Sequence, residues 1–168
     1  MMIDPARMDW PRLVPFAILA ASIGALIIVY TAELAFAIEP CILCLYQRIP
    51  YALAGALAVA ALLAPETWGS RPKVWAVIGA AVAFLAGAEV AFYHVGVEQH
   101  WWGSIAACGG AAPGDMTVEQ LRAGLAAQPP KPCDQVDWTL FGVSLAGYNV
   151  LSSLSLAVFS LAGARILI

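Results

Sequence analysis

The sequence predicts an all-α membrane protein, a four-helix transmembrane bundle with two outward-facing loops, the second long and containing a short amphipathic helix. Two observations carry this prediction. Hydrophobic residues make up 62% of the 168 residues and charged residues only 11%, whereas an ordinary soluble domain has about 25% charged residues. The apolar residues are also gathered into runs that approach the ~20 residues needed to cross a bilayer. We therefore expect a single transmembrane domain over residues 1–168 and exclude a water-soluble enzyme.

Four apolar runs are the expected membrane spans, at about residues 13–32, 45–64, 74–93 and 140–164. The second apolar run begins at Ile49, so a helix long enough to cross must include the residues before it. Cys44 and Arg48 are thereby drawn into the outer edge of the membrane. A short polar link from Pro65 to Lys73 joins the second and third spans, which predicts a helical hairpin.

Positive charges favour placing both termini in the cytoplasm, because cytoplasmic loops carry an excess of Lys and Arg. Five basic residues fall on the side of the termini (Arg7, Arg12, Arg71, Lys73 and Arg165) and three on the other (Arg48, Arg122 and Lys131). Tryptophans mark both boundaries, with Trp10, Trp68 and Trp75 at one and Trp101, Trp102 and Trp138 at the other. A cleaved signal peptide ending near Ala35–Ala37 is the alternative, but the first apolar run exceeds the usual 7 to 15 residues.

All four cysteines fall in the outward-facing segments, which the charge bias places at about residues 33–40 and 94–138 and at the entrance of the second span. Cys41 and Cys44 stand at that entrance, and Cys108 and Cys133 lie in the long loop. The compartment outside the bacterial cytoplasm permits disulfides, so this segregation predicts redox or structural disulfides. Zinc is the alternative, but it usually binds two closely spaced pairs, and 24 residues separate Cys108 from Cys133. We expect no metal ion.

The first cysteine pair has the spacing of a reactive dithiol. Pro40 suits the first turn of a helix, so we expect a helix to begin at Cys41, where the positive end of the helix dipole favours a thiolate. Cys41, Cys44 and Arg48 follow the i, i+3, i+7 rule and would share one helical face. Arg48 either reaches to lipid headgroups or stabilises negative charge that develops beside Cys44. No nucleotide or haem motif is present, so we expect a quinone as the electron acceptor.

The long loop combines a helix signal with turn residues. Thr117 and Gln120 have the spacing of a capping box, which predicts a short helix that lies along the membrane surface or packs on the bundle. Prolines and a glycine surround it (Pro113, Gly114, Pro129, Pro130 and Pro132) and place Cys108 and Cys133 on mobile flanks. A mobile disulfide can be attacked by a partner protein.

Polar residues inside the spans are few. Ser144, Tyr148, Ser152 and Ser155 give the fourth span a polar seam, which we interpret as interhelical hydrogen bonding. Glu89 in the third span is an intramembrane carboxylate, which is costly. Our hypothesis is that Glu89 is protonated or relays a proton from a reduced quinone.

Four segments of the sequence match a known family: CILCLYQR from Cys41 to Arg48, YHVGVE from Tyr93 to Glu98, Pro132–Asp134, and FGVSLAGYN from Phe141 to Asn149. The chain resembles, over nearly its whole length, the DsbB family of quinone reductases in the bacterial inner membrane. The Cys-x-x-Cys pair followed by Gln and Arg is the most specific element of this resemblance.

The resemblance implies a protein-dithiol:quinone oxidoreductase, a multi-pass protein of the bacterial inner membrane that supports disulfide bond formation. It would reoxidise a periplasmic, thioredoxin-fold dithiol oxidase similar to DsbA and pass the electrons to ubiquinone or menaquinone. His94, at the outer end of the third span, would lie near the quinone head. The net charge of −3 leaves no broad basic surface, so nucleic acid is not an expected partner.

The resemblance also assigns a role to each cysteine. Cys108 would accept the attack of the partner protein, and Cys133 would be the thiol released, able to pair transiently with Cys41. Cys44 would then be the sulfur that meets the quinone ring beside Arg48. Two alternatives are a membrane scaffold stapled by permanent disulfides and a related oxidase dedicated to one partner.

Overall fold

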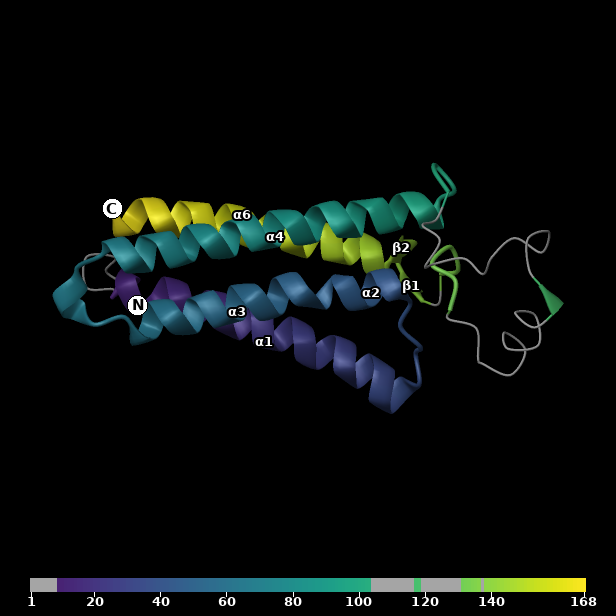
Figure 1. The fold of residues 1–168 in the computed structure, drawn as a ribbon, viewed down its shortest axis with the longest axis horizontal. Helices are drawn as coiled ribbons and strands as arrows, with labels where there is room; N and C mark the ends of the chain where they lie inside the picture. The colour runs from purple at the N-terminus through teal and green to yellow at the C-terminus, as the bar shows by residue number, and fades with distance from the viewer. Residues whose placement is uncertain (1–8, 104–116, 119–130, 137) are drawn as a thin grey trace.

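The computed structural model describes residues 9–103, 117–118, 131–136 and 138–168, and these form a bundle of long helices (Figure 1). Among these described residues, four stretches are long and apolar enough to cross a membrane, which confirms the predicted fold class: Trp10–Phe36, Ile42–Leu63, Arg71–Glu98 and Leu145–Leu167. The two marked ends of the chain lie at the same end of the bundle, opposite the strands, as an even number of crossings requires.

The helices are α1 (Trp10–Phe36), α2 (Ile42–Tyr46), α3 (Arg48–Leu63), α4 (Arg71–Glu98) and α6 (Leu145–Leu167). A short 3₁₀ helix, Glu66–Trp68, lies in the link between α3 and α4, so the predicted helical hairpin is confirmed. Lys73 at the start of α4 is buried and donates to Glu66 Oε1 at 2.7 Å. This ion pair ties the link to the hairpin.

The start of the fourth span was predicted wrongly. Instead of a helix from about residue 140, strands β1 (Thr139–Leu140) and β2 (Val143–Ser144) form an antiparallel hairpin, and α6 follows at Leu145. Phe141 and Gly142 both have positive φ, at 50° and 79°, as a two-residue hairpin turn requires. A run of apolar residues reads alike as strand or helix, which is why the hydropathy pattern missed the hairpin.

The second crossing is interrupted at its outer end. α2 ends at Tyr46 and α3 begins at Arg48, with Gln47 in a turn between them. Cys41 is the N-cap residue of α2, with an extended ψ of 170°, and not the first helical residue as predicted. Pro40 accordingly precedes the cap. The prediction that Cys41, Cys44 and Arg48 share one helical face therefore holds for the two cysteines. Arg48 is separated from them by the turn at Gln47 and does not lie on the same unbroken helix.

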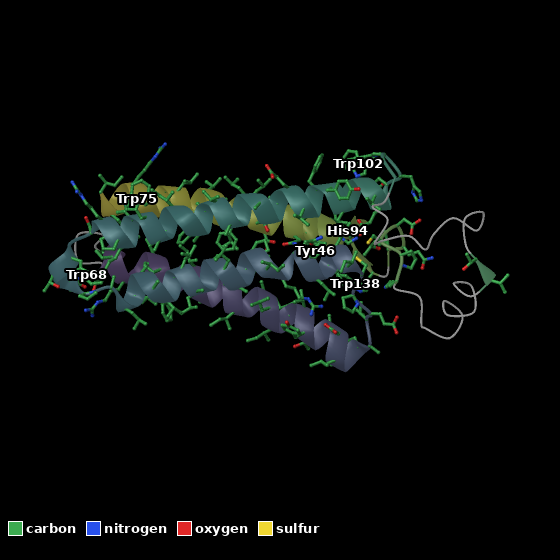
Figure 2. All side chains as sticks on the ribbon, in the orientation of Figure 1. Tyr46, Trp68, Trp75, His94, Trp102 and Trp138 are labelled. Atoms are coloured by element: carbon green, nitrogen blue, oxygen red, sulfur yellow. The ribbon has the colours of Figure 1, made fainter. Side chains whose placement is uncertain are left out.

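The core lies where α1, α3, α4 and α6 pack together, around side chains such as Ile18, Ala54, Phe84 and Ala157. Close approach at Gly87 shows how tight this packing is, because a Cβ there would lie 3.0 Å from Pro50 and 3.5 Å from Ser153 Oγ. Toward the cysteine end, α1 diverges from the other helices (Figure 1). Labelled tryptophans lie near both ends of the bundle, Trp68 and Trp75 at one and Trp102 and Trp138 at the other (Figure 2).

Candidate active site

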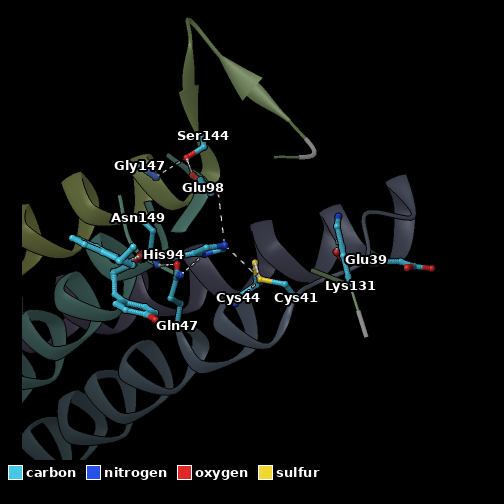
Figure 3. Close-up of polar contacts among 12 residues, drawn as sticks. Glu39, Cys41, Cys44, Gln47, His94, Glu98, Lys131, Ser144, Gly147 and Asn149 are labelled. Carbon is cyan, nitrogen blue, oxygen red and sulfur yellow. Dashed lines mark hydrogen bonds and ion pairs between the residues drawn. The ribbon is translucent and has the colours of Figure 1, made fainter. Parts of the chain in front are cut away.

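Cys41 and Cys44 are free thiols whose Sγ atoms lie 3.1 Å apart. The extended backbone at Cys41 turns its sulfur back over the first turn of α2, where it accepts a hydrogen bond from the backbone N–H of Cys44 at 3.4 Å. Cys41 is buried and Cys44 is half-buried. This geometry lets the two sulfurs share a proton when reduced and brings them close to disulfide distance (Figure 3).

The surroundings of Cys41 favour its thiolate. Its pKa is held well below that of an ordinary thiol, first by the hydrogen bond with the Cys44 side chain and then by His94. Burial raises the pKa and is a larger effect than His94, but it is smaller than the hydrogen bond with Cys44. His94 Nε2 lies 3.6 Å from Cys41 Sγ. Because the thiolate is the nucleophile in disulfide exchange, Cys41 is poised to attack a neighbouring disulfide.

His94 lies inside α4 and points toward the thiol pair (Figure 3). Its ring is buried and contacts protein groups on both nitrogens: Nδ1 lies 2.9 Å from Gln47 Nε2, and Nε2 lies 3.8 Å from Glu98 Oε1. The ring also interacts with the backbone of Cys133. His94 thus links the first cysteine pair to the segment of the long loop that carries Cys133.

Arg48 is held by α1, which the sequence did not predict. Its Nη2 lies 2.7 Å from Glu33 Oε2, and its guanidinium carbon lies 4.6 Å from the centre of the Tyr30 ring. The Arg48 side chain is only 14% exposed. Its Nε is buried and has no hydrogen-bond partner among the described residues. The cation is therefore fixed in place, and its buried Nε donor is still available.

A cavity of about 700 Å³ connects these groups. Both cysteines, Arg48 and His94 line it, so the structure brings together the site residues predicted around the second span. Its wall on the side of α1 is largely apolar, formed by residues that include Ala21, Ala25, Leu26, Ile28 and Val29. The cavity combines an apolar body with a few convergent polar groups, which is typical of small-molecule sites.

The second cysteine pair is described in part. Cys133 is disulfide-bonded and buried in an apolar cluster with Cys41, Leu43 and Val97. Lys131 Nζ donates to the carbonyl of Glu39 at 3.2 Å, which ties this segment to the loop before α2. Cys108 lies outside the described residues, as does the helix predicted from Thr117 beyond Val118. The structure thus places Cys133 beside the first pair.

The same residues provide a possible ligand set for a metal ion. The potential ligand atoms of Cys41, Cys44 and His94 all lie within 4.8 Å of one another. Two thiolates and an imidazole suit a soft ion such as zinc. The expectation that the protein uses no metal stays a prediction.

Several site residues were missed at the level of sequence: Glu33, Gln47, Tyr51, Glu98 and Asn149. Glu98 stands four residues after His94, a spacing that places both on one helix face and could have revealed it. Gln47 and Asn149 lie within motifs noted above, but no sequence rule pairs them. Glu89 is exposed on α4 and is not among the residues that line the cavity, so its proton-relay role stays a prediction.

Comparison with known proteins gives one consistent result. A family model described as disulfide bond formation protein DsbB matches residues 11–163. Disulfide bond formation protein B of Nitrosococcus oceani is 31% identical over 132 residues, covering 74% of this chain and 73% of the relative. The protein of the same name from Methylococcus capsulatus is 32% identical over 132 residues, covering 74% of this chain and 76% of the relative. An uncharacterized protein of Rickettsia prowazekii is 25% identical over 161 residues, or 95% of this chain and 91% of the relative. No solved structure matches the chain.

Proposed function

The chain belongs to the DsbB family of disulfide bond formation proteins, and we propose that it is a thiol:quinone oxidoreductase that reoxidises a DsbA-like partner. As a member of this family it is a multi-pass membrane oxidoreductase that acts in protein disulfide formation. The partner would be a soluble dithiol oxidase of the thioredoxin fold, and the final electron acceptor would be ubiquinone or menaquinone. The cysteines would face the periplasm, with both termini in the cytoplasm.

One observation carries this proposal. The thiol pair Cys41–Cys44 lies between a buried disulfide sulfur, Cys133, and the cavity that contains Arg48. Electrons that arrive at the long-loop disulfide have a short path to the thiol pair on one side, and an apolar binding space opens on the other. A scaffold with permanent structural disulfides would not need its first pair reduced, buried and beside such a cavity.

The thiol chemistry balances in three exchanges. The dithiol of the partner reduces the long-loop disulfide and becomes a disulfide itself. The long-loop dithiol then reduces a Cys41–Cys44 disulfide, which returns the loop disulfide and leaves the first pair as thiols. That redox state, with Cys41 and Cys44 free and Cys133 disulfide-bonded, is the one the structure shows. A quinone, when bound, would accept two electrons and two protons from the pair, leaving the Cys41–Cys44 disulfide.

The residues around the cavity fit a quinone. The buried Nε of Arg48 needs an acceptor, because an unsatisfied buried donor costs about 1–3 kcal/mol, and a quinone oxygen is such an acceptor. The positive charge of Arg48, fixed by Glu33, would stabilise negative charge that develops on that oxygen. The apolar wall from α1 would contact the ring and tail and exclude water. Cys44 would face the ring, and Cys41 would hold the thiolate for exchange with the loop.

Energetics supports a strong terminal acceptor. A DsbA-type couple lies near about −120 mV, while structural disulfides usually lie below about −300 mV. Moving two electrons uphill across about 180 mV would cost roughly 8 kcal/mol. An ordinary stable disulfide could not oxidise such a partner, so the loop pair would have to be strained or its reduced form would have to be reoxidised through the quinone.

The test is quinone reduction by the purified protein in detergent, driven by a reduced thioredoxin-fold oxidase and followed by the loss of quinone absorbance. The expected result is turnover that disappears in Cys44→Ser, while Cys44→Ser still forms mixed disulfides with the partner. No reduction of either quinone type, with the thiol state unchanged, would support the scaffold instead. Labelling of intact spheroplasts with a membrane-impermeant thiol reagent tests the proposed sidedness, because only outward-facing cysteines would react.

A further inference from the structure

Three polar side chains form a hydrogen-bonded chain that ends on His94. Tyr51 Oη of α3 donates to Asn149 Oδ1 of α6 at 2.7 Å. Asn149 Nδ2 donates to Gln47 Oε1 in the turn before α3, and Gln47 Nε2 lies 2.9 Å from His94 Nδ1 of α4. Figure 3 shows Asn149, Gln47 and His94 close together beside the two cysteines. These hydrogen bonds connect the second crossing and α6 to Nδ1 of His94 on α4.

These contacts have one direction. Each amide uses its oxygen to accept from the preceding member and its nitrogen to donate to the next, starting from the Tyr51 hydroxyl. Ser153 Oγ also donates to Asn149 Oδ1, at 3.2 Å, which further favours the oxygen at that position. With Gln47 donating, His94 Nδ1 must carry a lone pair. The ring proton of a neutral His94 is then on Nε2.

The other side of the ring leads to the same assignment independently. His94 Nε2 faces Cys41 Sγ at 3.6 Å and Glu98 Oε1 at 3.8 Å. The Glu98 side chain is only 6% exposed, and its second oxygen accepts from the Ser144 hydroxyl. A thiolate and a carboxylate are both acceptors, so a bare lone pair on Nε2 would face two like-charged groups. A proton on Nε2 can donate to the Cys41 sulfur, and it replaces this repulsion from Glu98 by attraction.

We propose that Gln47 and Asn149 are positioning residues that hold His94 as a neutral imidazole with its proton on Nε2, directed at the Cys41 sulfur. His94 is then a fixed hydrogen-bond donor to the Cys41 thiolate and not a base that removes its proton. No covalent bond forms or breaks in this role, and no electron moves. Once Cys41 enters a disulfide and loses its negative charge, Glu98 is the remaining charged acceptor for the same N–H.

This inference deepens the proposed function, because turnover through Cys41 is what the donor serves, yet the proton position can be measured without a quinone. The charged and titratable groups that line the cavity are Cys41, Cys44, Arg48, Glu98, Lys131, Glu39, Tyr51, Tyr148 and, paired with Arg48, Glu33. Of these, Cys41 and Glu98 contact the imidazole ring. The donor from Gln47 disfavours a second ring proton, because a protonated Nδ1 would face an N–H group.

The direct test is ¹⁵N NMR of the reduced full-length protein in detergent, labelled at histidine. The chain has two histidines, and His100→Gln, at an exposed position, assigns the signals. Neutral His94 protonated on Nε2 is expected at neutral pH. Asn149→Leu removes the hydrogen bond between Asn149 and Gln47, so a mixture of His94 tautomers is expected in this variant. A His94 protonated on Nδ1 or on both nitrogens, or an unchanged tautomer in Asn149→Leu, would overturn the proposal.

A second readout is the pH dependence of Cys41 alkylation, quantified by mass spectrometry. Losing a well-directed hydrogen bond is worth about 0.5–1.5 kcal/mol, which is roughly 0.4 to 1 pH unit. Asn149→Leu is therefore expected to raise the alkylation midpoint by about that much. Tyr51→Phe is the milder variant in case Asn149→Leu does not fold, and a smaller rise is expected. An unchanged or lowered midpoint in both variants would contradict the proposal.

The matched control is Tyr148→Phe. Tyr148 precedes Asn149 on α6, but its hydroxyl donates to the carbonyl of Leu140 at 3.0 Å and takes no part in the chain. The midpoint of Cys41 alkylation in Tyr148→Phe should equal that of the wild type. An equal shift in Tyr51→Phe and Tyr148→Phe would show that the effect comes from a general loss of packing and not from the hydrogen bonds to His94. If the wild type has the expected His94 tautomer but does not reduce quinone, the proposed function is wrong and this inference stands. If the wild type reduces quinone but His94 has a different tautomer, the proposed function stands and this inference is wrong.

Discussion

Arg48 and Glu33 form an ion pair between α3 and α1, with Nη2 and Oε2 2.7 Å apart. Glu33 is in the last turn of α1 and Arg48 is the first residue of α3, so the pair connects the α1 wall of the cavity to the helix that follows the cysteines. Because both side chains are largely withdrawn from solvent, at 14% and 32% exposed, each charge depends on the other. The same contact therefore shapes the cavity and orients the cation inside it.

Arg48→Ala should impair quinone use specifically. Removing a fixed positive group beside a developing negative charge typically costs about 100-fold in rate. Quinone reduction should fall by about that factor, while disulfide exchange between the partner and the long loop continues, as seen by mixed disulfides on non-reducing gels. Arg48→Lys should recover part of the rate. Equal rates in the wild type and Arg48→Ala would refute the assigned role.

Glu33→Gln should destabilise the fold near the cavity. The substitution leaves the Arg48 charge without its partner, and hydrogen bonds to charged groups contribute about 1.5–3 kcal/mol. We expect a lower midpoint of thermal unfolding in detergent and a higher KM for quinone. Glu39→Gln is the control for the unfolding midpoint, because the Glu39 side chain is exposed. A midpoint that falls equally in both variants would show that the ion pair is not responsible.

Cys41 should remain reactive in acid. Its lowered pKa, set mainly by the hydrogen bond with Cys44, keeps the thiolate present well below about pH 8.5, the ordinary thiol value. Alkylation of Cys41 should therefore change little between pH 8 and about pH 6, where an ordinary thiol slows about tenfold per unit. A tenfold loss per unit over that range would be incompatible with the structure.

The same shift has a consequence for stability. The folded pKa of Cys41 lies below the unfolded one, so the thiolate stabilises the reduced fold above the unfolded pKa. That contribution is lost as the pH falls toward the folded pKa. Thermal unfolding of the reduced protein should show this loss, and Cys41→Ser should lack it.

Gly87→Ala should disturb helix packing. An added methyl group would lie 3.0 Å from Pro50 on α3, and overpacking typically costs about 1–3 kcal/mol. We expect a lower unfolding midpoint than for Gly24→Ala, where nothing lies within 4 Å of the new Cβ. If the two variants unfold together, α3 and α4 do not meet as closely as described.

Local sequence patterns were sufficient to predict the four crossings and the close spacing of the first cysteine pair. Both follow from local properties, because the length of an apolar run decides whether a helix can span a bilayer, and Cys-x-x-Cys spacing places two sulfurs within one helical turn. The stretch before Leu145 shows the limit of such patterns. There, the same apolar residues form a hairpin, and the turn at Phe141 and Gly142 depends on backbone angles that hydropathy does not report.

The contacts that distant helices make around the thiol pair could not be predicted from these patterns. Glu33 reaches Arg48 from α1, and Asn149 reaches Gln47 from α6, 102 positions away in the chain. No periodicity within one segment encodes such a contact, because it depends on how α1 and α6 are rotated against α3. The physical reason is that a helix sets the spacing along its own face, whereas packing between helices sets which faces oppose each other. The spacing of the two thiols is thus set within one helical turn, whereas the groups that surround them are set by how the helices pack.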